Sequence, residues 1–219
     1  MDELAYVEIE PAANATASVI WLHGLGADGH DFEPIVPHLG IAPDLAIRFV
    51  FPHAPRLPVT INNGHVMPAW YDVFEMDLSR KVDETQLRAS AIAVSRLITR
   101  ENERGINTNR IILAGFSQGG AVAFELALSH PERLAGLVAL STYFATRNSV
   151  DINPANAGLP IFIGHGTRDP VVAESFGADS FSHLTEMGYA VEYHTYAVEH
   201  GVDLEEIQDI GRWITLRLA

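Results

Sequence analysis

Short apolar runs alternate with longer amphipathic stretches along almost the whole chain, and this alternation restricts the fold more than any other property of the sequence. Runs rich in β-branched residues are typical of strands, whereas apolar residues three or four positions apart are typical of helices. A chain that alternates the two winds into a mostly parallel sheet with helices on both faces. We therefore predict an α/β fold, with strands over residues 17–22, 47–51, 110–115, 135–140, 160–163 and 191–197, and helices over residues 84–103, 118–129, 176–187 and 204–218.

The first predicted strand differs from the others in its pattern. Residues 5–9 alternate apolar and polar side chains, as an edge strand with one solvated face does. We expect this strand to pair with the chain that follows it.

A long segment over about residues 52–83 does not follow the alternation. It is rich in Pro, Gly and Asn, which predicts an ordered loop. Loops of this length in compact domains are usually functional or disordered, and aromatic residues such as Trp70 and Phe74 argue against disorder. We predict that the loop covers the substrate; the alternative is a structural excursion without a role in binding.

Length and hydrophobic content predict one domain over residues 1–219. A chain of 219 residues, of which 47% are hydrophobic, can bury roughly 70% of its unfolded surface in one core. Ten histidines but no cysteine are present, so disulfides, thiolate metal sites and cysteine nucleophiles are excluded.

The charge of the chain excludes some partners. The 28 acidic and 14 basic residues give a formal net charge of −14, which repels a phosphate backbone, so we expect no nucleic-acid partner. The sequence shows neither a basic leader followed by an apolar run nor about 20 uninterrupted apolar residues. We therefore expect no stable membrane insertion and a cytoplasmic location.

A strained turn between a strand and a helix is predicted at Ser117. The residues Gly115-Phe116-Ser117-Gln118-Gly119 separate an apolar strand from a helix that starts with small residues. In such a nucleophile elbow the serine hydroxyl projects above the sheet, and glycine two positions on either side avoids a clash. The bare pattern occurs by chance in roughly one chain of this length in ten to twenty. The strand-turn-helix context makes chance far less common, so Ser117 is the predicted nucleophile.

A serine nucleophile needs a carboxylate and then a histidine later in the chain. Asp169 follows the strand that ends in Gly164-His165-Gly166 by a short loop, which places it where the active sites of open α/β sheets collect. Its alternative role is that of a turn-forming residue before Pro170. The elbow upstream favours the catalytic role for Asp169.

Three histidines follow Asp169 in the chain. His183 lies in a predicted helix and His194 lies within a predicted strand, where both would be ordinary structural residues. His200 lies just beyond that strand, in a loop from which an imidazole can reach over the edge of the sheet. We therefore predict His200 as the general base.

The oxyanion formed during attack needs two hydrogen-bond donors. One is the backbone N–H of Gln118, at the start of the helix after the nucleophile. The other is expected in residues 21–26 (WLHGLG), where glycines let the backbone approach a ligand closely. A simple tight turn is the alternative. Each donor typically contributes about 3 kcal/mol to transition-state stabilisation.

Four motifs together resemble a known family. They are VIWLHGLGADGHDF at residues 19–32, PVTINNG-x-x-MPAWYD at residues 58–72, AGFSQGGAV at residues 114–122 and GHGTRDPVV at residues 164–172. On these motifs, which span nearly the whole chain, the sequence resembles the bacterial carboxylesterases of the phospholipase/carboxylesterase family, relatives of the acyl-protein thioesterases. The resemblance implies an α/β-hydrolase fold.

The resemblance also implies the parts of the site. It assigns catalysis to Ser117, Asp169 and His200, and the oxyanion donors to the N–H groups of Leu25 and Gln118. It implies a shallow apolar acyl groove, no metal ion or organic cofactor, and frequent homodimers. The groove in this chain would draw on Leu25, Ile61, Met67, Trp70 and Phe116, whose alternative role is to fill the core or anchor the loop.

One departure from the family lies beside the histidine. Family members usually carry Met-Gly before it, whereas Val198-Glu199 precede His200 here. The carboxylate of Glu199 would either favour the imidazolium form or simply face solvent.

The resemblance favours a serine carboxylesterase acting on a small acyl ester through an acyl-enzyme. An acyl-protein thioesterase or lysophospholipase with the same triad is the first alternative. A binding protein that keeps the fold without catalysis is a remote one, because such proteins lose triad members and this chain has all three in order.

Overall fold

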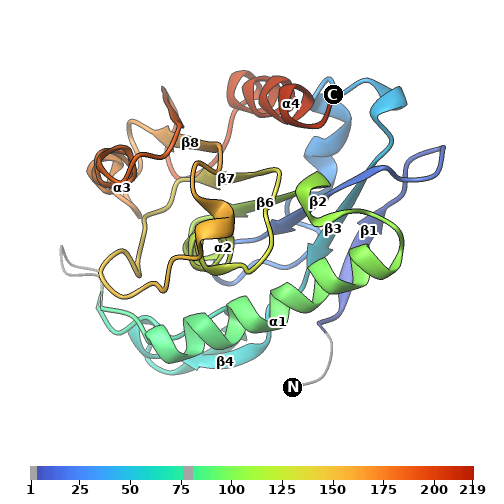
Figure 1. Ribbon diagram of the computed structural model, residues 1–219. Coiled ribbons are helices and arrows are strands. Elements are labelled where there is room, and N and C mark those ends of the chain that lie inside the picture. Colours follow the sequence, from blue (N-terminus) through green and yellow to red (C-terminus); the bar gives the residue numbers. More distant parts are fainter. Residues whose placement is uncertain (1–3, 76–80) are drawn as a thin grey trace.

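The computed structural model describes residues 4–75 and 81–219, and these form an α/β structure around a seven-stranded sheet (Figure 1). The strand order is β1-β3-β2-β6-β7-β8-β9, and every neighbouring pair is parallel except β1 with β3. The predicted α/β-hydrolase fold with a mostly parallel sheet is therefore confirmed. The strands are β1 (Tyr6–Ile9), β2 (Ala17–Leu22), β3 (Ile47–Pro52), β6 (Ile111–Phe116), β7 (Gly136–Leu140), β8 (Ile161–Gly166) and β9 (Val191–Tyr196).

Helices cover both faces of the sheet (Figure 1). Alternate side chains of a strand point to opposite faces, so Ile20 and Leu22 of β2 join one apolar core while Val19 and Trp21 join the other. The first core is closed by α1 (Glu84–Glu103), α2 (Gln118–Ser129) and α3 (Glu174–Glu186), and the second by α4 (Leu204–Leu218).

The helix boundaries follow from local capping. The side chain of Asp83 accepts a hydrogen bond from the Gln86 amide at the start of α1, and Asp203 does the same for the Glu206 amide at the start of α4. Both helices begin and end where the sequence predicts, as does α2. Helix α3 begins at Glu174, two residues earlier than predicted.

The predicted pairing of the first strand is wrong. Strand β1 pairs with β3, not with β2, which follows it directly in the chain. Strand β2 is central, and its two edges are taken by β3 and β6. The outer edge of β3 is therefore the one that β1 meets. An ion pair joins Glu10, just after β1, to Arg48 of β3, and another joins Glu8 of β1 to Arg104 at the end of α1.

The segment predicted as a loop contains a hairpin. Strands β4 (Arg56–Val59) and β5 (His65–Pro68) form a two-stranded antiparallel sheet of their own. Asn63 (φ 55°) and Gly64 (φ 72°) take left-handed conformations in the turn between them, which suits these two residue types. A short 3-10 helix, Thr60–Asn62, lies in the connection between the two strands, and Val73 forms an isolated antiparallel bridge with Val82. Residues 76–80 of the predicted loop lie outside the described residues.

None of the helices within residues 4–75 and 81–219 combines the length and the apolar character that crossing a membrane requires.

Candidate active site

Ser117 occupies a strained turn between β6 and α2. Its φ of 54° and ψ of −118° are unusual for a residue with a side chain. A Cβ added to Gly115 would lie 2.5 Å from the Gly119 carbonyl oxygen, and one added to Gly119 would lie 2.5 Å from that of His23. The two glycines are therefore required because backbone passes directly over them.

Three side chains from separate loops form a hydrogen-bonded chain. His200 Nε2 lies 3.0 Å from Ser117 Oγ, and His200 Nδ1 lies 2.6 Å from Asp169 Oδ2. Asp169 follows β8 and His200 follows β9, and the carboxyl ends of parallel strands meet at one edge of the sheet. The structure thus brings together the three residues that the sequence singled out. With Nδ1 protonated and donating to Asp169, Nε2 is free to accept the Ser117 proton.

The carboxylate of Asp169 is held in its charged form. Burial works against ionisation, but hydrogen bonds from His200 and from the amides of Val172 and Val171 outweigh it and keep the pKa of Asp169 below its usual range. Both amides donate to Oδ1 at 2.8 Å, which leaves Oδ2 to His200. The loop therefore fixes both the charge and the orientation of this group.

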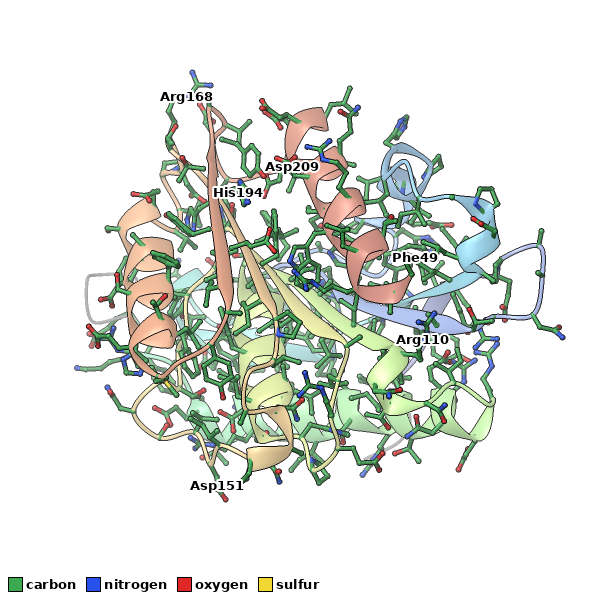
Figure 2. The ribbon with its side chains drawn as sticks, turned by 45° about the horizontal axis from the view of Figure 1, so that its top comes forward. Phe49, Arg110, Asp151, Arg168, His194 and Asp209 are labelled. Atoms are coloured by element: carbon green, nitrogen blue, oxygen red, sulfur yellow. The ribbon has the colours of Figure 1, made fainter. Side chains whose placement is uncertain are left out.

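The other downstream histidines lie elsewhere. His183 is on α3, where its ring is 6.1 Å from that of Phe144. His194 is on β9, on the α4 side of the sheet, and stacks on Phe162 at 5.2 Å (Figure 2). Neither contacts Ser117, so among these histidines the described geometry places His200 alone beside the nucleophile.

The predicted oxyanion donors flank the nucleophile. A Cβ added to Gly24 would lie 3.5 Å from Ser117 Cβ, so the loop after β2 runs directly beside the serine. The amides of Leu25 and Gln118 donate to no other group in the part of the chain that the structure describes. The first amides of a helix lack intrahelical partners, which accounts for that of Gln118. Two unpaired N–H groups beside the half-buried serine that lines the pocket suit a negatively charged oxygen.

An apolar pocket opens at the serine. Its volume is about 490 Å³, within the range of small-molecule sites. Leu25, Ile61 and Phe116 line it as predicted, and the Phe116 ring lies 4.7 Å from that of His200. Residues that the sequence analysis did not single out also line it: Ala27, Asp31, Asn62, Tyr71, Val73, Tyr143, Val171 and Val172.

Trp70 and Met67, which were predicted to bind substrate, both lie outside the pocket lining. Trp70 is 1% exposed, lies outside the pocket lining, and donates its indole N–H to the His23 carbonyl at 2.8 Å. Met67 also lies outside the lining, and its sulfur accepts a hydrogen bond from the Asn62 side chain at 3.3 Å. Aromatic content alone does not tell which side chain of an irregular segment turns inward.

Glu199 faces solvent. Its side chain is exposed, and within the described residues its carboxylate has no hydrogen-bond or ion-pair partner. Of the two alternatives for this departure from the family pattern, the structure favours the solvent-facing one.

Comparison with known proteins places the chain in a family. The model of the family described as Phospholipase/Carboxylesterase matches residues 4–218. The chain belongs to this family. Family members share the α/β-hydrolase fold described above, and the chain is accordingly a serine hydrolase.

Several relatives of this family member carry names of thioesterases. It is 38% identical to acyl-protein thioesterase 1 of Neurospora crassa, over 96% of this chain and 90% of the relative. The solved structure of Arabidopsis thaliana SOBER1 is 31% identical with a TM-score of 0.85, covering 93% of this chain and 99% of that one. Zea mays acyl-protein thioesterase 2 is 26% identical with a TM-score of 0.86, covering 98% and 99%. These relatives are fungal and plant proteins, so the predicted resemblance to the bacterial branch in particular is not supported.

Proposed function

We propose that this chain is an acyl thioesterase that cleaves thioester-linked acyl chains through an acyl-enzyme on Ser117. The observation that carries the proposal is the hydrogen-bonded chain Ser117–His200–Asp169 at the mouth of an apolar pocket. The names of the most similar fungal and plant relatives support the thioester class over the simple carboxylesterase that the motifs first suggested.

In the first half of the reaction, Ser117 Oγ attacks the acyl carbonyl carbon while its proton passes to His200 Nε2. The carbonyl oxygen becomes negatively charged and accepts hydrogen bonds from the Leu25 and Gln118 amides. The bond from the carbonyl carbon to the leaving sulfur then breaks, and His200 returns the proton to the departing thiol. Asp169 stays ionised and stabilises the imidazolium that forms in between.

In the second half, water takes the place of the thiol. It gives a proton to His200 and attacks the acyl carbonyl, and a second oxyanion forms at the same two amides. Collapse of this intermediate releases the carboxylic acid, and Ser117 recovers its proton. No redox step or external group is required by this sequence.

The lining of the pocket supports an acyl chain as the part of the substrate that is bound. Side chains of Leu25, Ile61, Val73 and Phe116 supply apolar surface, and no lysine or arginine is among its lining residues within the described chain. Four of the lining residues come from residues 61–73, which supports the prediction that this segment covers the substrate.

Carboxylesterase activity is the second candidate. The family's description names it, and none of the lining side chains distinguishes sulfur from oxygen at the leaving atom. A homodimer and a cytoplasmic location remain predictions from the sequence.

Paired oxygen and sulfur esters of increasing chain length test the proposal. We expect kcat/KM to be higher for the thioester at each length and to rise by up to about fourfold per added CH₂, because each buried CH₂ contributes about 0.8 kcal/mol. Spontaneous thioester hydrolysis is subtracted with Ser117→Ala, and labelling of the wild type by a fluorophosphonate checks that the serine is reactive. Equal or faster turnover of the oxygen esters, with a maximum at two to four carbons, would instead indicate a short-chain carboxylesterase.

A further inference from the structure

Trp70 connects the two segments that carry the predicted oxyanion donors. Its indole N–H donates to the carbonyl of His23, two residues before Leu25, and its backbone N–H donates to Gln118 Oε1; both distances are 2.8 Å. Its own carbonyl accepts a hydrogen bond from the hydroxyl of Ser90 on α1. Every polar group of this buried residue is therefore bonded to a different part of the site's framework.

The side chain of Gln118 completes the connection on the side of the nucleophile. Besides accepting from Trp70, it donates through Nε2 to the carbonyl of Tyr71 at 2.6 Å. Gln118 is 4% exposed, so these bonds are shielded from water. The residue whose amide is one oxyanion donor is thus held by its side chain to residues 70 and 71.

The other donor segment is held equally firmly. His23 is buried, and burial lowers its pKa, so the ring is neutral and can both donate and accept. Its Nδ1 lies 2.7 Å from the Gly24 carbonyl and its Nε2 accepts the Ala54 amide at 3.0 Å. The Gly26 amide donates to the Pro68 carbonyl at 2.9 Å. Among the hydrogen bonds of the described residues, those of Trp70 are the ones that connect this loop, through a single residue, to the helix after the nucleophile.

We propose that Trp70 is a positioning residue that sets the separation of the Leu25 and Gln118 amides and thereby the stabilisation of the oxyanion. It lies outside the pocket lining and acts through His23 and Gln118. The proposal rests on the proposed function, because it assigns those amides their role in acyl transfer. An error of about 1 Å in such a site costs on the order of 100-fold in rate, which is why a fixed separation matters.

The test is Trp70→Phe, which keeps a buried aromatic ring but removes the donor to His23. We expect kcat to fall roughly 10-fold to 100-fold, less than the loss of a whole donor, while KM changes by less than about threefold. Affinity for a trifluoromethyl ketone, whose serine adduct carries an oxyanion, should fall by a similar factor. Trp213→Phe is the matched control, because Trp213 is 2% exposed and its indole N–H has no acceptor among the described residues. This control should leave kcat and the inhibitor affinity unchanged.

Two outcomes would overturn the positioning role: a folded Trp70→Phe enzyme with the kcat of Trp213→Phe, or a rise in KM alone. If Trp70→Phe does not fold, Gln118→Met replaces it, since it removes the bonds to residues 70 and 71 but keeps the backbone amide; the same fall in kcat is expected, and its absence counts against the proposal. The comparison uses whichever ester the wild type cleaves fastest. If the enzyme shows no preference for thioesters, that result therefore leaves the test of the positioning role unaffected.

Discussion

Ser117→Ala is expected to lower kcat by about 10⁶-fold on the best substrate, as removal of the serine does in other serine hydrolases. Without Oγ, no acyl-enzyme can form, and the hydrogen bond to His200 Nε2 at 3.0 Å is lost. The pocket lining and both oxyanion amides remain, so substrate binding should change little. Steady-state kinetics on purified protein, with KM or a measured Kd as the second readout, check the expectation.

Ser141→Ala is the matched control for this variant. Ser141 follows β7, the neighbour of β6 in the sheet, and it also has a positive φ, of 44°. Its hydroxyl is buried and has no hydrogen-bond partner within the described residues. The control should keep kcat within about twofold of the wild type. Turnover by Ser117→Ala at a few per cent of the wild-type rate would contradict the nucleophile assignment.

The order of the catalytic residues could be predicted because local signals place each of them. Gly115 and Gly119 are required around Ser117 because a Cβ at either position would clash with backbone atoms. Asp169 and His200 each lie in a short loop after a strand, β8 and β9 respectively, and in a parallel sheet that position brings them to the same edge. His194, by contrast, lies within β9, and its side chain is directed to the α4 side of the sheet.

The pairing of β1 and the β4–β5 hairpin were not predicted, for physical reasons that differ. The partner of β1 depends on which strand edges remain open once β2 is in the centre, which is a property of the whole sheet. The hairpin does have a local signal, the Asn63-Gly64 pair between two short runs, but Pro58 and Pro68 within those runs weaken the strand pattern.

The pocket lining was predicted only in part because side chains of irregular segments do not share a face at any regular spacing. In a helix or a strand, spacing tells which side chains share a face, but Trp70 and Tyr71 are neighbours in a bend. Tyr71 lines the pocket, whereas Trp70 points to the loop after β2. Two hydrogen bonds decide this, one from the Trp70 amide to Gln118 Oε1 and one from the Ser90 hydroxyl to the Trp70 carbonyl, and neither is visible from residue 70 alone.

A second large effect, that of pH on the stability of the fold, is expected from Glu206 in the first turn of α4. The residue is fully buried, its carboxyl group packs directly against Gly164 of β8, and neither oxygen has a hydrogen-bond partner within the described residues. Burial, together with the charge of Asp203, raises the pKa of Glu206 to about 8. In the unfolded chain an ordinary glutamate ionises near pH 4.5. Between these two values the folded protein holds a proton that the unfolded chain has released.

This difference makes the fold less stable as the pH rises. The stabilisation from the bound proton is fully present below about pH 4.5 and is lost as the pH approaches and passes 8, because the unfolded state binds fewer protons throughout that window. A glutamine at this position cannot ionise. We therefore expect the free energy of unfolding of Glu206→Gln, relative to the wild type, to rise by about 3 kcal/mol between pH 5.5 and pH 8.5.

Urea unfolding of both proteins at the two pH values measures this change, and at constant m-values it appears in the midpoints. For a chain of this size it corresponds to roughly 6–12 °C in Tm at the higher pH. Comparing the two pH values removes any constant effect of burying an amide in place of a carboxyl group. Glu205→Gln is the matched control, since Glu205 is the exposed neighbour on the same helix and should show the same difference from the wild type at both pH values. If the difference between Glu206→Gln and the wild type is equal at pH 5.5 and pH 8.5, the pKa of Glu206 in the folded protein is not raised into this range and the residue is ionised at both pH values.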